Sequence, residues 1–239
     1  MRPGTGTRGR PHVAEAARLQ IRLHAVDLHP MPPRPARLFF DLWSLVYDQP
    51  VVQRLTYRPV HDAVLDELRL RPPRRLLDLG CGTGLFTRRL RDELRDARVV
   101  GCDYSRGMLR QARAKSPRGL FAQGDAQRLP FGDASFDTVI STEAFHWFPD
   151  QAAALDEIQR ILEPGGRLLV ALVNPPVEGM GDAVWWASRL AGQPFYWPTQ
   201  QRMRTLLADA GFTVATQRRI WRVPAGLLFP PVLSVGVRP

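Results

Sequence analysis

Lysine and cysteine are both scarce in this sequence. Of its 33 basic residues only Lys115 is a lysine, and the two cysteines are Cys81 and Cys102. Their spacing fits no zinc site and two are too few for a disulfide framework, so we expect reduced thiols in the cytosol. No cluster of His, Cys, Asp and Glu has the spacing of metal ligands, so the sequence predicts no metal site.

Long hydrophobic runs are also absent. The sequence has no stretch of about 18 uncharged apolar residues that could cross a membrane, and no apolar segment near its start resembles a signal peptide. Of the 239 residues 44% are apolar, which is enough to bury the core of one α/β domain. We therefore expect one domain with additions and a cytoplasmic location.

Acidic residues are outnumbered, with 23 against 33 basic residues and a net charge of +10. Because nearly all the cations are arginines, and Ala and Pro are also abundant, the bias is typical of a GC-rich coding background. Many arginines, as in Arg88–Arg95, lie on predicted helix faces, where solvation explains them. Charge alone can attract an anionic partner, but it is not sufficient to predict a nucleic-acid partner.

Residues 1–37 are rich in Arg, Pro and Gly and have little periodicity, which predicts a disordered tail. Met31 opens the run that leads into ordered-looking sequence, so it is an alternative start of the native protein. An Arg-rich transit segment is the other interpretation, which Glu15 and Asp27 weaken.

The most specific pattern is the run LLDLGCGTG at residues 76–84. Its apolar residues predict a strand that is buried on both faces of a parallel sheet. Its glycines allow positive φ and a close approach of the backbone to a ligand. Phe86, Leu90 and Leu94 then mark one face of an amphipathic helix, whose free amide groups would meet an anionic group. This is not the dinucleotide fingerprint, because Leu85 and Thr87 stand where its third glycine is needed.

The pattern D-x-G-x-G-x-G at 78–84 resembles the nucleotide loop of class I S-adenosylmethionine-dependent methyltransferases. Three further matches follow in the family's order. The first is D-x-S-x-x-M-L at 103–109, which follows an apolar run, and the second is Gly124-Asp125-Ala126. The third is a strand at 136–141 followed by L-x-P-G-G at 162–166, which resembles the family's turn before its fifth strand. The resemblance is specific over 75–173 and looser over 38–222. It is to the small-molecule branch that includes quinone-biosynthesis and polyketide-tailoring enzymes.

The resemblance implies S-adenosyl-L-methionine as the cofactor and gives roles to several residues. Asp103 would accept hydrogen bonds from the ribose hydroxyls, and Met108 would pack on the adenine. Asp125 would accept from the adenine amino group, and the backbone amide of Ala126 would meet a ring nitrogen. The expected cofactor-binding residues are Asp78, Gly80, Gly82, Gly84, Asp103, Tyr104, Met108, Asp125, Ala126, Ser141 and Thr142.

The expected fold is α/β. It is a Rossmann-like, doubly wound, mostly parallel sheet of seven strands, with an antiparallel C-terminal strand and N-terminal helices over the cofactor site. The domain at 38–239 divides into N-terminal helices (38–72), a cofactor-binding core (73–173), an acceptor-side insert (174–200) and a closing helix and strands (201–239). The closing part is a helix at Arg202–Ala210, capped by Gly211, and an antiparallel pair at Phe212–Trp221 and Leu228–Val237.

Methyl transfer from a sulfonium depends on in-line approach and exclusion of water more than on acid–base chemistry. An oxygen or carbon acid as acceptor would also need a base. His146, just past the fourth strand, is the candidate base, and Glu143 is second. The alternative is that His146 shapes the edge of the cofactor site without titrating.

Aromatic residues are dense after the fifth strand, where this fold usually builds its acceptor pocket. The candidate acceptor-contacting residues are Trp185, Trp186, Phe195, Tyr196 and Trp197, with Tyr47 from the N-terminal helices. Core packing of a helix at Asp182–Leu190 explains some of these rings equally well. Asn174-Pro175-Pro176 is similar to the motif of amine methyltransferases, but it follows the fifth strand, and Val177 stands where that motif has an aromatic residue.

We therefore predict a methyltransferase that acts on a small apolar or aromatic metabolite, with O- or C-methylation favoured. An RNA or protein methyltransferase is one alternative, favoured only by charge. A non-catalytic relative that binds the cofactor to regulate a partner is another, and the acids at 78, 103 and 125 argue against it. A nicotinamide dehydrogenase is disfavoured by Leu85 and Thr87.

Overall fold

The computed structural model describes residues 49, 51, 53–175, 186, 196–221 and 230–239. The predicted tail at 1–37 lies outside the described residues, and so do Tyr47, Trp185 and Phe195. The predicted helix at Asp182–Leu190 is also outside them, apart from Trp186.

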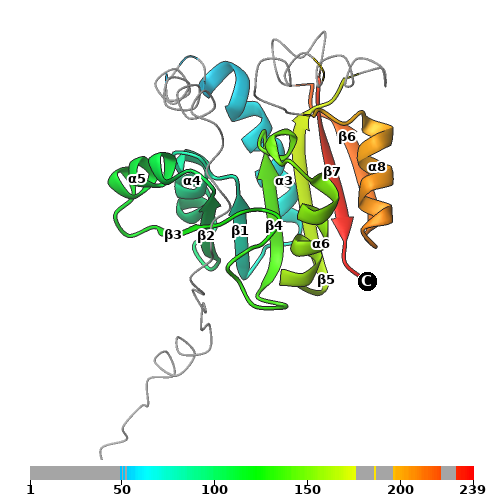
Figure 1. Cartoon of the computed structure of the whole chain (residues 1–239). Helices are drawn as coiled ribbons and strands as arrows, with labels where there is room; N and C mark the ends of the chain where they lie inside the picture. Colours follow the sequence, from blue (N-terminus) through cyan, green and yellow to red (C-terminus); the bar gives the residue numbers. More distant parts are fainter. Residues whose placement is uncertain (1–48, 50, 52, 176–185, 187–195, 222–229) are drawn as a thin grey trace, which may run out of the picture.

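The described residues form one seven-stranded sheet in the order β3-β2-β1-β4-β5-β7-β6 (Figure 1). Strands β1 to β5 pair in parallel, and β7 pairs antiparallel with both β5 and β6. The predicted doubly wound, mostly parallel sheet with an antiparallel end is therefore confirmed. The strands are β1 Arg75–Leu79, β2 Arg98–Asp103, β3 Leu120–Gln123, β4 Phe136–Thr142, β5 Leu162–Val173, β6 Thr213–Arg219 and β7 Pro231–Val237.

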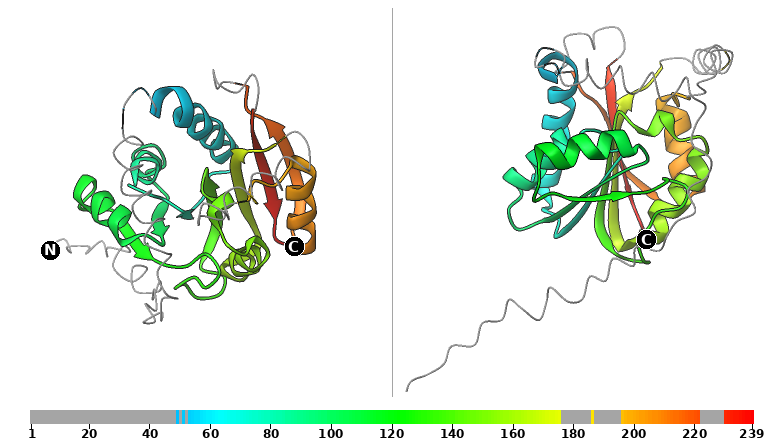
Figure 2. Two further views of the ribbon diagram at one scale, coloured as in Figure 1. Left: turned by 45° about the horizontal axis from the view of Figure 1, so that its top comes forward. Right: turned by 60° about the vertical axis from the view of Figure 1, so that its left-hand side comes forward.

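Helices cover both faces of this sheet (Figure 2). One hydrophobic core joins α3 and α4 to one face, and a second joins α6 and α8 to the other. Both cores form because apolar side chains point to alternate faces of the buried strands. The helical elements are η1 Gln53–Tyr57, α3 Arg58–Leu70, α4 Leu85–Glu93, α5 Arg106–Lys115, η2 Phe145–Trp147, α6 Gln151–Ile161 and α8 Gln200–Asp209. No helix among the described residues is long and apolar enough to cross a membrane.

Side-chain caps explain where several helices begin. Ser105 Oγ accepts from the Met108 amide at 3.2 Å at the start of α5, and Asp150 caps α6 through the Ala153 amide at 3.0 Å. Such caps satisfy amide groups that the first helical turn leaves free. Helix α8 begins two residues before its predicted start, and Gly211 follows its end with φ +80°, as its predicted C-terminal cap requires.

The fifth strand is longer than its sequence pattern predicts. The L-x-P-G-G run is expected as a turn before the strand, but β5 already begins at Leu162 and continues through Gly165 and Gly166. The pairing with β4 shifts register between Phe136 and Thr138. The run is thus an irregular part of the strand, which positive φ at Gly165 (+76°) allows.

Register brings the chemistry-bearing loops to one edge of the sheet. Leu79 lies beside Cys102, Asp103 beside Gln123, and Thr142 beside Ala171. Because these strands are parallel, the segments that leave β1, β2, β3 and β4 all begin at the same edge.

Candidate cofactor site

The three glycines after β1 all have positive φ, at +76° for Gly80, +53° for Gly82 and +75° for Gly84. A Cβ on Gly80 would lie 2.3 Å from that of Ala144, and one on Gly84 would lie 2.9 Å from that of Ala112. These two glycines therefore permit close packing of the loop on its neighbours. A Cβ on Gly82 would meet no described atom within 4 Å. Gly82 thus presents bare backbone to open space, as the approach of a ligand requires.

The acid at the end of β2 holds this loop. Asp103 Oδ2 accepts from the Gly82 amide at 2.8 Å, and Oδ1 accepts from the Ser105 amide at 2.8 Å. Burial raises the pKa of Asp103, while these two backbone hydrogen bonds act in the opposite direction. Since a carboxylate has about four acceptor positions, two remain for a diol.

Asp78 lies beneath the loop rather than in it. Its side chain is 1% exposed, and its Oδ2 accepts from Thr87 Oγ1 at 2.6 Å. Burial raises its pKa to about 7, the Thr87 hydrogen bond lowers it, and Asp103 raises it. Asp78 therefore anchors the start of α4, and its predicted contact with the cofactor stays a prediction.

The residues predicted for the adenine end gather beside Asp103. The Gly124 amide donates to the Asp103 carbonyl at 3.2 Å, which starts the loop that carries Asp125 and Ala126. Burial raises the pKa of Tyr104, and the charge of the nearby Asp125 adds to this rise. Met108 lies in the first turn of α5, partly buried.

The end of β4 carries two further predicted residues and the second candidate base. Ser141 is fully buried, and its Oγ has no hydrogen-bond partner among the described residues. Thr142 is partly buried. Glu143 follows with φ +50°, rare for a residue with a side chain. Burial raises the pKa of Glu143 to about 7, and a backbone hydrogen bond from Val173 lowers it.

His146 lies in a cluster of aromatic rings. Its ring centroid is 5.1 Å from that of Trp147 and 5.2 Å from that of Trp197, and its side chain is 5% exposed. Burial lowers the pKa of His146 to about 3, so the imidazole is neutral near pH 7. This environment supports the alternative that His146 shapes the edge of the cofactor site without titrating.

Of the predicted acceptor-contacting residues, two are brought to this cluster. The Tyr196 amide donates to the His146 carbonyl at 2.9 Å, which places Trp197 against His146. Trp186, by contrast, is 60% exposed.

Two anchoring residues, Gln151 and Asn174, are absent from the sequence-based assignment. Gln151 Nε2 donates to the carbonyls of Phe145 at 3.3 Å and Tyr196 at 2.8 Å. Asn174 Nδ2 donates to the Pro198 carbonyl at 2.5 Å. Gln151 carried no sequence signal, whereas Asn174 stood out in its Asn-Pro-Pro run. That run follows β5 as expected, and its asparagine fixes the segment that carries Trp197.

The arrangement fits an adenosine-containing cofactor. Gly82 offers exposed backbone, and Asp103, at the end of β2, has free acceptor positions for a diol. The buried hydroxyl of Ser141 lies on β4, on the other side of β1 from β2. Among the described residues there is no group of three or more His, Cys, Asp and Glu that could hold a metal ion.

Comparisons with known proteins agree with this geometry. Residues 77–170 match the family model described as a methyltransferase domain. The chain is 34% identical over 191 residues to a demethylmenaquinone methyltransferase of Thermus thermophilus, covering 70% of this chain and 84% of that protein. It is 43% identical over 114 residues to the enzyme of that name from Beutenbergia cavernae, and there the match spans about half of each, 48% of this chain and 47% of the relative.

Solved structures show the same fold. A chain from a complex of the Haloferax volcanii Trm112 methyltransferase activator and a methyltransferase aligns with a TM-score of 0.66 at 29% identity, over 84% of this chain and 97% of that chain. A Thermotoga maritima structure described as an S-adenosylmethionine-dependent methyltransferase aligns with a TM-score of 0.65 at 22% identity, over 86% of this chain and all of that one.

Proposed function

The chain belongs to the class I family of S-adenosylmethionine-dependent methyltransferases, and we propose that it methylates a small aromatic metabolite of the quinone type. The observation that carries this proposal is the aromatic cluster at the cofactor edge. Trp147 and Trp197 flank His146 just beyond β4, where an acceptor would meet the cofactor loops. Aromatic walls favour flat apolar rings. The demethylmenaquinone methyltransferases among the relatives support the same class.

S-adenosylmethionine, when bound, supplies an activated methyl group on a sulfonium. The chain's own residues then bind the cofactor and the acceptor and orient one relative to the other. We assign the adenosine end to Gly82, Asp103, Tyr104, Met108, Asp125 and Ala126, and the methionine end to the segments after β1 and β4, with Ser141 and Thr142. Orientation of two reactants can lower a barrier by about 7–11 kcal/mol, so no residue has to form a covalent bond.

We assign the removal of an acceptor proton to Glu143 rather than to His146. Glu143 as a whole residue is partly exposed, and burial of its carboxyl group raises its pKa to about 7, which suits a base near neutral pH. His146 is 5% exposed and has a pKa of about 3, which makes it a weak base behind two tryptophan rings. The order of the two sequence-based candidates is therefore reversed in this proposal, and His146 is given the shaping role.

The proposal is tested by an acceptor assay with purified chain and radiolabelled S-adenosylmethionine. The acceptors are a 2-demethylated naphthoquinol, a malonyl thioester and unmodified RNA. A malonyl thioester is included because a malonyl-[acyl-carrier protein] O-methyltransferase of Halorhodospira halophila is 36% identical over 156 residues. We expect label in the quinol. Label in the thioester or RNA alone would refute the acceptor class, and tight cofactor binding without turnover would favour the regulatory alternative.

The cellular location is part of the same proposal. Both cysteines are buried and free, which is compatible with a reducing compartment, and we infer that the protein works in the cytosol.

A further inference from the structure

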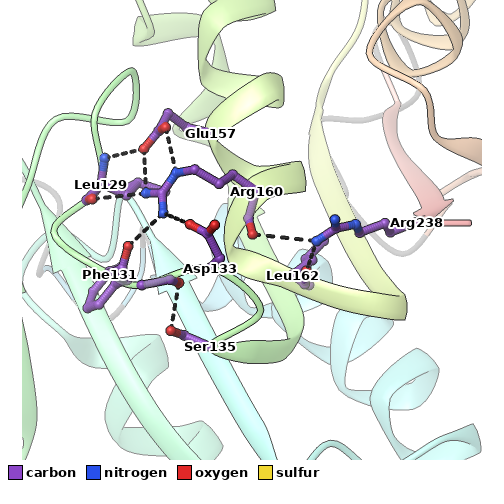
Figure 3. Close-up of polar contacts among 9 residues, drawn as sticks. Leu129, Phe131, Asp133, Ser135, Glu157, Arg160, Leu162 and Arg238 are labelled. Atoms are coloured by element: carbon purple, nitrogen blue, oxygen red, sulfur yellow. Dashed lines mark hydrogen bonds and ion pairs between the residues drawn. The ribbon is translucent and has the colours of Figure 1, made fainter. Parts of the chain in front are cut away.

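The loop between β3 and β4 is held along its length by one helix, α6. At the start of α6, the Asp150 amide donates to Gln127 Oε1 at 3.0 Å. At its end, Arg160 and Glu157 reach the part of the loop that follows Arg128 (Figure 3). The loop has no regular structure of its own beyond one isolated bridge, Asp125 to Arg128, so these contacts set its path.

Arg160 is the centre of the second group of contacts. Its Nη1 donates to the Phe131 carbonyl at 2.9 Å and to Asp133 Oδ1 at 2.7 Å, and its Nη2 donates to the Leu129 carbonyl at 3.3 Å. The guanidinium also forms a two-pronged pair with Glu157, through Nε at 2.8 Å and Nη2 at 2.9 Å. Figure 3 shows these groups converging on one side chain. A planar fork with five donors suits this set, and an ammonium does not.

Glu157 completes the contact. Its Oε2 accepts from the Leu129 amide at 2.8 Å, so the pair binds both the amide and the carbonyl of one loop residue. The hydrogen bonds that Arg160 donates to Glu157 raise the pKa of Arg160. Burial raises the pKa of Glu157, but hydrogen bonds from Arg160 and Leu129 outweigh it and the net shift is downward. Both groups are therefore charged at neutral pH.

The loop doubles back, so its far part rests on its near part. A Cβ on Gly124 would lie 2.6 Å from Pro130 Cδ, which shows how closely the two segments pack. Leu129 and Phe131, on either side of Pro130, are the residues whose backbone Arg160 holds, and both are buried, at 4% and 5% exposure. A shift of Pro130 would therefore be passed to Gly124 and to its neighbour Asp125.

We propose that Arg160, paired with Glu157, is a positioning residue that fixes Asp125 for recognition of the amino group on the cofactor's purine. This rests on the proposed function, because Asp125 and Ala126 are the residues assigned there to the adenine. Arg160 itself contacts no part of that site. It acts through the backbone of Leu129 and Phe131. Its loss would reduce the preference for a purine that carries the amino group, without removing any residue that binds the cofactor.

The test compares two ligands that differ at the purine edge facing Asp125 and Ala126: S-adenosylhomocysteine and its deaminated form, S-inosylhomocysteine, in which a carbonyl replaces the amino donor and the adjacent ring nitrogen carries a proton. Calorimetric dissociation constants are measured for the wild-type chain and for Arg160→Lys, which keeps the charge and loses the fork. A hydrogen bond to a carboxylate predicts a wild-type preference of about tenfold or more for the adenosyl ligand. We expect the preference of Arg160→Lys to fall to about threefold or less.

Arg238→Lys is the matched control. Arg238 Nη1 donates to the carbonyls of Leu162 and Arg160 at the base of α6, and no described contact of its side chain reaches the loop residues 124–133. Its substitution should lower the melting temperature and leave the ligand preference unchanged. If Arg160→Lys fails to fold, Glu157→Gln replaces it, since that change removes the charge of the pair and weakens both prongs.

The outcomes separate the two proposals. If the wild-type chain binds neither ligand, the proposed function is wrong. If it prefers the adenosyl ligand and the folded α6 variant, Arg160→Lys or its replacement Glu157→Gln, keeps that preference while losing only thermal stability, Arg160 is merely structural and the inference is overturned. A lost preference in the α6 variant but not in Arg238→Lys establishes the positioning role.

Discussion

Single residues differ sharply in what they do within the glycine loop. Gly80 and Gly82 both have positive φ, but only at Gly80 would an added Cβ meet another part of the chain, the Cβ of Ala144. Sequence alone could not separate them, because the pattern contains three identical residues. The distinction arises from the segment after β4, which is about sixty residues away along the chain and packs on the loop only in the folded sheet.

The two glycines should therefore respond differently to alanine. Gly82→Ala should cost about 1–2 kcal/mol of stability from the left-handed backbone, and should abolish measurable S-adenosylhomocysteine binding because its methyl group occupies ligand space. Gly80→Ala adds a 2.3 Å clash with Ala144 and should lower the free energy of unfolding further. Chemical denaturation and calorimetry measure the two effects. Equal stability losses with unchanged ligand affinity in Gly82→Ala would contradict this assignment.

The pH dependence of the rate distinguishes Glu143 from His146 as the base. A carboxyl group acts as a base only when ionised, so with a pKa of about 7 the rate should rise as pH increases through 7. His146, with a pKa of about 3, is already neutral over this whole range and contributes no such rise. The pH profile of kcat should keep its rising limb in His146→Gln and lose it in Glu143→Gln. A limb that disappears only in His146→Gln would return the base to the histidine.

At the scale of elements, pattern and periodicity predicted most of the fold. Apolar runs that end in an acid or a glycine predicted β1 and β2. The antiparallel pair predicted at Phe212–Trp221 and Leu228–Val237 corresponds to β6 and β7. What could not be predicted depends on pairing across the sheet. The extended start of β5 pairs Leu162 with Phe136 of β4, and Gly165 and Gly166 exchange backbone hydrogen bonds with Arg238, just beyond β7. The unusual backbone of Glu143 is accompanied by a hydrogen bond from its amide to the Ala171 carbonyl at 2.8 Å.

The same holds for the wall of the candidate acceptor site. The aromatic residues at 196 and 197 were predicted from the density of aromatic residues after the fifth strand and from the place where the resembled fold builds its acceptor pocket. Their contact with His146 depends on Gln151 and Asn174, whose side chains hold the segment at 196–198. Side-chain amides that bind a distant backbone carbonyl leave no local pattern in a sequence.

These anchors supply a prediction at this scale. Gln151→Leu should release Tyr196 and with it Trp197, and so raise the KM for the acceptor by about tenfold while leaving the affinity for S-adenosylhomocysteine within about twofold of wild type. Gln201→Leu, an exposed position on α8, serves as the matched control. Steady-state kinetics with varied acceptor measure the effect. An equal loss of cofactor affinity in Gln151→Leu would show that the segment does not belong to a separate acceptor wall.

At the scale of the whole molecule, one cluster of basic residues lies away from the cofactor edge. A groove of about 400 Å³ between α4 and the turn before β3 is lined by Arg88, Arg91, Asp92, Lys115, Ser116, Pro117 and Arg118. This turn leads directly into β3, so it lies at the sheet edge opposite to the loops that bind the cofactor. The groove can attract anions without presenting them to the methyl group.

Any RNA binding should accordingly be weak, unspecific and unrelated to catalysis. We expect binding of a single-stranded RNA to be detectable by fluorescence anisotropy at low salt and to vanish by about 0.2 M salt, because it consists of counterion release. Arg118→Glu should weaken it further and leave methyl transfer unchanged. Tight RNA binding that persists in high salt and competes with the quinol acceptor would instead support the RNA methyltransferase alternative.

The central claim is that this sheet edge binds S-adenosylmethionine through the loop after β1 and the acid that ends β2. Calorimetric titration with S-adenosylhomocysteine, with NADH as the control ligand and Asp103→Ala as the control protein, tests it most directly. We predict micromolar binding of the first ligand, none of NADH, and a loss of about 1–3 kcal/mol in Asp103→Ala through its diol contacts. Binding of NADH, or an affinity for S-adenosylhomocysteine that Asp103→Ala leaves unchanged, would contradict the account.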